Sequence, residues 1–300
     1  MRTGPGTVIG AAWSSSWRIG ICGLAFAGGL IASRLLFQVF GLDLARMPAQ
    51  APEETAGYYL IAGSIALAVG TVWVAQGVGS TWIKRWVVVS AFLIVGFGLS
   101  TTIETAIYGT VDRPSLLVLL FLFPCLLLAT LEAALFAPGQ DGRWDRPASE
   151  FFRSRVWPDW AWRLAAGVVL FPVVYLVFGI LVSPIVTEHY AQGVAGLALP
   201  SPGVIVRTQL LRSILHLLVA IPVMVLWRGS RLQLVAALSL AFFVFVAAYD
   251  VILANEIPLI LVLTHGLEVL ADSAVYSWVL VALLVPPRWW GEQVRAGSAS

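Results

Sequence analysis

The chain has 300 residues, of which 59% are hydrophobic and only 11% are Asp, Glu, Lys or Arg. Soluble domains carry about 25% charged residues, so this chain holds too little charge to cover a water-facing surface. A soluble enzyme, a nucleic-acid-binding module and a disordered protein are therefore excluded, and the composition indicates a multi-pass membrane protein.

Eight segments are long and apolar enough to cross a bilayer, since a spanning helix needs about 20 mostly apolar residues. They cover residues 18–41, 57–79, 85–108, 114–137, 162–184, 205–227, 231–254 and 257–285. Pro114 opens one segment and Pro286 closes the last, at helix ends that tolerate proline. We predict an all-α bundle of about eight transmembrane helices.

The basic residues in the loops and at the ends of these segments are distributed unequally between the two sides of the membrane. Thirteen would face the side that holds both chain ends, whereas three, Arg46, Arg113 and Arg207, would face the other side. Cytoplasmic loops are enriched in Lys and Arg. The sequence therefore predicts an integral plasma-membrane protein with both termini in the cytoplasm.

Several features recur at an offset of about 145 residues, which suggests two related halves. Trp17-Arg18 matches Trp162-Arg163, Glu104 matches Asp250, and Pro114 matches Pro258. The predicted organisation is a four-helix half (1–137), a cytoplasmic connector (138–161), a second four-helix half (162–287) and a cytoplasmic tail (288–300). An even number of helices per half makes these parallel repeats. Chance similarity is the alternative explanation, because few residues are identical.

Nine ionisable side chains fall inside the predicted spans, where a charge costs about 2.5–3.5 kcal/mol on insertion scales. Such residues are usually paired, buried in the bundle or functional. At about 1.5 Å per residue, all but Glu132 are expected in the outer half or the middle of the bilayer. These eight form the predicted ligand or proton pocket: Arg34, Glu104, Arg212, His216, Asp250, His265, Glu268 and Asp272.

The last span carries the most specific local pattern. His265, Glu268 and Asp272 are spaced i, i+3 and i+7, which places them on one helical face. The predicted pocket contains two arginines and four carboxylates. Protonation, a divalent metal or a cationic ligand would each balance this charge, and a hydrated cavity would relax the need for balance.

The favoured function is a small-solute or proton-linked transporter, since acidic and histidine side chains inside spanning helices are typical of proton relays. The first alternative is a non-catalytic membrane component, such as an assembly factor, a sensor or a partner subunit. The second is a membrane-embedded metal enzyme, with His216, His265 and Glu268 as candidate ligands. No other cofactor is predicted, and the expected partners are the lipid bilayer and a small-molecule or cation ligand, not nucleic acid.

Overall fold

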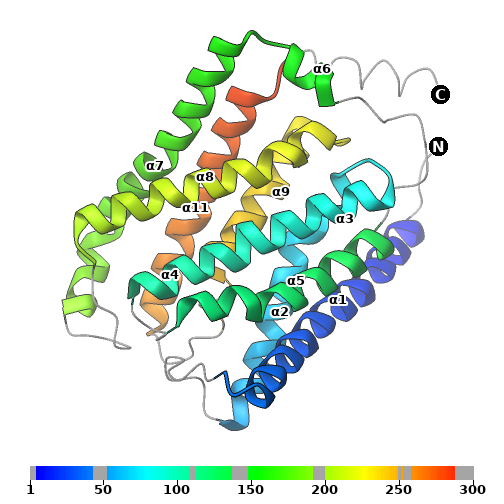
Figure 1. Cartoon of the computed structure of the whole chain (residues 1–300), viewed down its shortest axis with the longest axis vertical. Coiled ribbons are helices and arrows are strands. Elements are labelled where there is room, and N and C mark those ends of the chain that lie inside the picture. Colours follow the sequence, from blue (N-terminus) through cyan, green and yellow to red (C-terminus); the bar gives the residue numbers. More distant parts are fainter. Residues whose placement is uncertain are drawn as a thin grey trace.

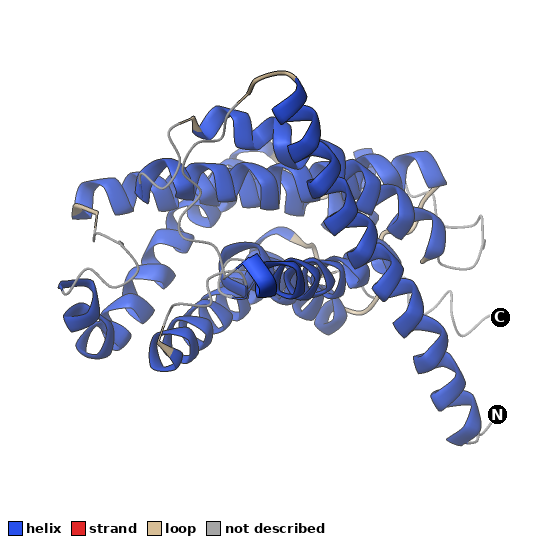
Figure 2. Cartoon of the chain, turned by 90° about the horizontal axis from the view of Figure 1, so that it is seen from below, coloured by secondary structure: helices blue, strands red, loops and turns tan. Residues whose placement is uncertain are grey.

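The computed structural model describes residues 5–42, 53–108, 113–136, 148–191, 200–248, 252 and 258–287. Every named element in these ranges is a helix (Figure 2). In chain order, the elements are α1 (Pro5–Val39), α2 (Glu53–Gly77), α3 (Trp82–Ala91), η1 (Phe92–Leu99), α4 (Ser100–Tyr108), α5 (Pro114–Leu135), α6 (Ala148–Arg153), α7 (Trp157–Ala191), α8 (Pro202–Leu226), α9 (Arg231–Phe243), η3 (Val244–Ala248) and α11 (Leu259–Leu284).

Seven helices in the described part of the chain are long and apolar enough to cross a membrane. They span Ser15–Val39, Ala56–Gly77, Trp82–Ile107, Pro114–Leu135, Trp157–Thr187, Pro202–Leu226 and Leu259–Leu284. The expected seventh of eight spans, 231–254, corresponds to a shorter apolar helix, Arg231–Ala247, because residues 249–251 and 253–257 lie outside the described ranges. On length and composition, the chain is a multi-pass helical membrane protein.

The outer helices of the bundle are arranged in the same way in its two halves. In Figure 1, α5 lies between α1 and α3, and α11 lies between α7 and α9. The contacts between the halves run from α2 to α9 and from η1 and α4 to α8. Helices α2, η1, α8 and α9 therefore form the centre of the bundle.

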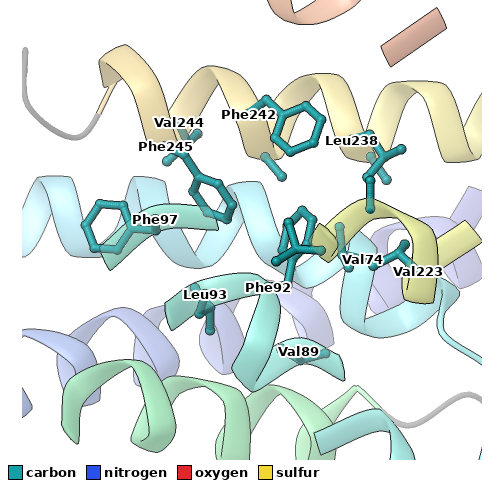
Figure 3. Packing of buried hydrophobic residues seen from close by; sticks show 14 of the residues in the cluster. Val74, Val89, Phe92, Leu93, Phe97, Val223, Leu238, Phe242, Val244 and Phe245 are labelled. Carbon is teal, nitrogen blue, oxygen red and sulfur yellow. The ribbon is translucent and has the colours of Figure 1, made fainter. Parts of the chain in front are cut away.

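The centre is filled by four phenylalanines, two from each half (Figure 3). Phe92 lies 5.2 Å from Phe245 and 6.0 Å from Phe242 between ring centroids, and Phe97 lies 5.9 Å from Phe245. A Cβ atom added to Gly96 would lie 2.8 Å from the Phe245 ring, so the missing side chain permits this packing. Close packing of this kind holds membrane helices together, because lipid supplies no hydrophobic driving force between them.

Two helices continue as a π-helical stretch: η1 follows α3, and η3 follows α9. A π-turn holds one residue more than an α-turn, so it rotates the helical face that follows by about 100°. The direction in which Glu104 of α4 points therefore depends on η1.

Two short loops meet at one end of the bundle. Val78 and Trp227 form an antiparallel bridge, in which Gly79 N–H donates to the Leu226 carbonyl and Arg228 N–H donates to the Gly77 carbonyl, both at 2.9 Å. We call residues 77–81 and 226–230 the paired loops. They connect equivalent helices of the two halves, since one lies between α2 and α3 and the other between α8 and α9.

Arg85 anchors the first of the paired loops. It is only 4% exposed, and it donates to the carbonyls of Val78, Ser80 and Ala133, each at 3.1 Å. The last carbonyls of a helix have no intrahelical donor, and this arginine supplies one for α5. Arg85 is thus a buried link between α3, the loop and α5.

Two further arginines donate hydrogen bonds to helix C-termini at this end of the bundle. Arg18 Nη1 donates to the Leu135 carbonyl of α5 at 3.0 Å, and Arg163 Nη1 donates to the Leu283 carbonyl of α11 at 2.8 Å. Cations near a helix C-terminus also interact favourably with the helix dipole. The C-terminal ends of α5 and α11 are therefore each held by an arginine, from α1 and α7 respectively.

The connector is more structured than its polar composition suggests. Its short helix α6 buries Phe151 completely, against Trp160 at 5.4 Å between ring centroids. Arg155 then donates to the Leu284 carbonyl at 2.6 Å. The described part of the connector thus packs on the end of α11, and α7 begins at Trp157, before the expected boundary.

Candidate functional site

An ion pair joins the two halves at the end of the bundle away from the paired loops. Arg212 of α8 donates from Nη2 to the Glu104 carboxylate of α4. The Arg212 side chain is 4% exposed and that of Glu104 is 23% exposed. Because both charges are largely out of water, the loss of either partner would leave a costly isolated charge.

The inward face of α8 is polar around this arginine. Gln209, Arg212, Ser213 and His216 are all buried there, at the i, i+3, i+4 and i+7 positions of one face. Ser213 Oγ donates to the Gly167 carbonyl of α7 at 3.0 Å. The absence of a side chain at Gly167 lets α7 and α8 approach closely enough for this bond, since an added Cβ would meet Leu217 of α8 at 3.3 Å.

The first half of α11 supplies the acidic and histidine side chains of the site. His265 Nδ1 lies 3.2 Å from Glu268 Oε2, with His265 37% exposed and Glu268 8% exposed. Asp272 follows one turn later and is 3% exposed. Glu268 faces Gly179 of α7, where an added Cβ would lie 3.5 Å from its Oε1.

These two groups are close enough in space to influence one another. His265 lies within electrostatic range of both Glu104 and Arg212, and Asp272 within range of Glu268 and His265. We refer to these five residues as the polar cluster. It combines three carboxylates, one guanidinium and one imidazole, and it is built from α4 of the first half and α8 and α11 of the second.

His216 lies one turn deeper on α8, among aromatic rings. Its ring stacks on Phe242 at 4.4 Å and meets Phe171 edge-on at 5.2 Å between centroids. Tyr276 of α11 lies 4.8 Å from Phe171, and its hydroxyl is 3.1 Å from Ser213 Oγ. We call His216, Phe171, Phe242 and Tyr276 the histidine-aromatic group.

Several buried polar atoms next to the polar cluster have no hydrogen-bond partner among the described residues. They are Gln209 Oε1, both ring nitrogens of His216, Asp272 Oδ1 and Ser277 Oγ. An unsatisfied buried polar atom costs about 1–3 kcal/mol. Those of Gln209, His216 and Asp272 lie on the buried faces of α8 and α11, where water or a polar ligand would satisfy them.

The predicted pocket residues are not all brought together. Arg34 is exposed on α1, whose main neighbours are α5 and α2, so it does not face the polar cluster. Asp250 lies outside the described residues. The other six lie in the polar cluster or, for His216, in the histidine-aromatic group directly beside it.

The ligands expected for a metal centre do not assemble. Among the described residues, no three His, Cys, Asp or Glu side chains are grouped so that they could hold a metal ion. Of the candidate ligands, His216 is fully buried between Phe242 and Phe171, whereas His265 and Glu268 follow each other along α11. Helical spacing places His265 and Glu268 on one face of α11, but a metal site also needs three ligands that converge on one point.

The aromatic part of the site could not be recognised in the sequence. Phe171 and Phe242 resemble ordinary apolar residues of spanning helices, and only the packing shows that they enclose a histidine.

No protein-family model matches the chain, and no curated protein or solved structure is significantly similar to it. The chemistry that these side chains permit is proton exchange at carboxyl and imidazole groups and the binding of a polar or cationic molecule.

A second buried carboxyl lies in the first half, far from the polar cluster along the helices. Glu132 of α5 is fully buried, and its Oε1 accepts a hydrogen bond from Thr71 Oγ1 of α2 at 2.6 Å. Its other oxygen has no partner among the described residues. This single carboxyl has no neighbouring group comparable to the polar cluster, and it offers a control for the experiments below.

Proposed function

We propose that this protein is a proton-linked carrier of a small solute and that the polar cluster is its binding site. The observation that carries this proposal is the convergence of Glu104, Arg212, His265, Glu268 and Asp272 from three helices and both halves. Ionisable residues inside a membrane domain that face the bundle interior are typical of substrate and proton pathways.

A purely structural role fits these contacts less well. The Arg212–Glu104 pair alone could join the halves of a non-catalytic membrane component. However, Asp272 Oδ1 and the ring nitrogens of His216 are buried without a hydrogen-bond partner among the described residues. Their burial costs stability and adds no hydrogen bond to such a scaffold. Groups retained at such a cost are more readily explained as binding groups.

We also propose that the chain is a parallel 4+4 repeat with an axis along the membrane normal, and with both termini in the cytoplasm of a plasma-membrane protein. The matched bonds of Arg18 to Leu135 and of Arg163 to Leu283 support the repeat. The bridge between the paired loops also supports it, because a two-fold axis brings equivalent loops together in antiparallel fashion. The basic residues Arg18, Arg85 and Arg163 gather at the paired-loop end, in accordance with the positive-inside rule.

The proposal is tested in proteoliposomes that contain a pH-sensitive dye. We expect purified wild-type protein to move protons when a gradient of its solute is imposed, and Glu268→Gln to reduce this movement about tenfold or more, since each factor of ten corresponds to about 1.4 kcal/mol. The solute is found by screening wild-type protein with mixtures of amino acids, sugars, organic acids and amines.

The matched control is Glu132→Gln, which changes the other buried carboxyl in the same way. A carrier site at the polar cluster requires proton movement to survive in Glu132→Gln and to fail in Glu268→Gln. Equal loss in both variants, or no proton movement by folded wild-type protein with any mixture, would refute the proposal and favour the non-catalytic component.

A further inference from the structure

Asp272 is the carboxylate of the polar cluster that has no basic partner among the described residues. Glu104 is paired with Arg212, and Glu268 lies 3.2 Å from His265, but Asp272 Oδ1 is buried without a hydrogen bond in the described part of the chain. The charged or titratable groups nearest to it are Glu268 and His265 on its own helix. A buried carboxylate of this kind is stable only when a proton or a cation neutralises it.

The buried face of α11 becomes aromatic after Asp272. Tyr276 follows Asp272 by one turn on the same buried face of α11, and its ring lies 4.8 Å from Phe171. Phe171 in turn contacts His216 of α8, the titratable group on that side. A carboxylate beside aromatic rings is the combination by which proteins recognise organic ammonium ions, since the rings attract the positive charge and accommodate the carbon substituents.

The unpartnered polar atoms around this position suit the same ligand. Gln209 Oε1 can accept an N–H donor, and neutral His216 presents one nitrogen as an acceptor and the other as a donor. A divalent metal ion is a poorer fit, because no three acidic, histidine or cysteine side chains of the described residues are grouped to ligate one. The arrangement thus favours a ligand with a single positive charge and an organic body.

We propose that the polar cluster binds a small organic ammonium ion whose charged nitrogen sits on Asp272, in exchange for a proton. This assignment rests on the proposed carrier function and specifies its substrate class. In the exchange, the carboxylic acid of Asp272 releases its proton to water as the ammonium ion binds, so the charge of the site is the same before and after. A site that is always occupied by one or the other couples the two movements in opposite directions.

The test is proton release on binding, measured with a pH indicator in weakly buffered solutions of the purified full-length protein. The probes are methylammonium, tetramethylammonium and benzylammonium chlorides, each compared with sodium chloride at the same ionic strength. We expect at least one of the three to release about one proton per chain, as for one carboxyl exchanging its proton for a cation, and sodium chloride to release none. Asp272→Asn should abolish the release, and Glu132→Gln should retain it.

The comparison of salts needs no variant, so it decides the question even if Asp272→Asn does not fold. Proton release by sodium chloride equal to that by all three ammonium salts, or release by none of them, would overturn the assignment. If no ammonium salt releases protons but the Glu268-dependent proton movement in proteoliposomes is present, the substrate class is wrong and the carrier function stands. If ammonium salts release protons but no solute drives proton movement, the ligand is correct and the carrier function fails.

Discussion

The two halves of the bundle are alike at the paired-loop end and different at the opposite end. At the paired-loop end, Arg18 and Arg163 each lie over an adjacent tryptophan, Trp17 or Trp162, and each donates to the last turn of the fourth span of its own half. At the opposite end, α11 carries the acidic part of the polar cluster. The contacts of the two halves thus match at the paired-loop end, whereas the second half supplies four of the five residues of the polar cluster at the opposite end.

One pair of contacts illustrates this difference. In the first half, Gly29 of α1 faces Pro124 of α5, where an added Cβ would lie 3.0 Å from the proline Cα. In the second half, Gly179 of α7 faces Glu268 of α11. The absence of a side chain at Gly29 thus permits the close approach of α5, whereas a side chain at Gly179 would meet the Glu268 carboxylate only at an ordinary contact distance.

The largest expected effect on stability is at the joint between the halves. Arg212→Leu should destabilise the protein by about 3–5 kcal/mol, because it leaves the Glu104 carboxylate without its buried partner. Adding Glu104→Leu should restore much of that loss, since both charges are then removed. Unfolding in detergent by SDS or heat measures the cycle, and a double variant no more stable than Arg212→Leu would show that the pair does not hold the halves together.

A smaller effect separates the two glycines. Gly29→Ala should cost about 1–3 kcal/mol, because its methyl group meets the backbone of Pro124. Gly179→Ala should change stability by less than about 0.5 kcal/mol, since the carboxylate of Glu268 lies at an ordinary contact distance. Its effect should instead appear in proton movement. The same unfolding assay compares both variants, and equal losses of stability would mean that the two contacts are equivalent.

The smallest expected effect tests the likeness of the paired-loop ends. Arg18→Ala and Arg163→Ala should each cost about 1–2 kcal/mol, because each removes a charge-assisted bond to a helix-terminal carbonyl. Arg163→Ala should cost at most about 1 kcal/mol more than Arg18→Ala, because Arg163 also pairs with the partly exposed carboxylate of Asp159. A marked loss for one alone, measured by the same unfolding method, would count against the repeat.

The sequence allowed much of the site to be anticipated, and its limits have physical causes. His265, Glu268 and Asp272 share a face because helical spacing alone dictates it, and the structure buries Glu268 and Asp272 of that face while His265 stays 37% exposed. Arg34 shows the limit, since an arginine within an apolar span faces the interior or the surface according to which neighbours its helix has. The direction of Glu104 depends on the π-helical stretch before it, which composition does not signal.

The composition and the apolar segments of about 20 residues or more were sufficient to assign a multi-pass helical membrane protein. The reason is that the bilayer requires every spanning backbone to satisfy its own hydrogen bonds. Which charges meet is a different matter. The pairing of Arg212 with Glu104, the enclosure of His216 by Phe171 and Phe242, and the burial of Arg85 all join residues of separate helices. Such contacts follow from how helices pack and where glycines let them approach, and these are properties of the assembled bundle rather than of any one segment.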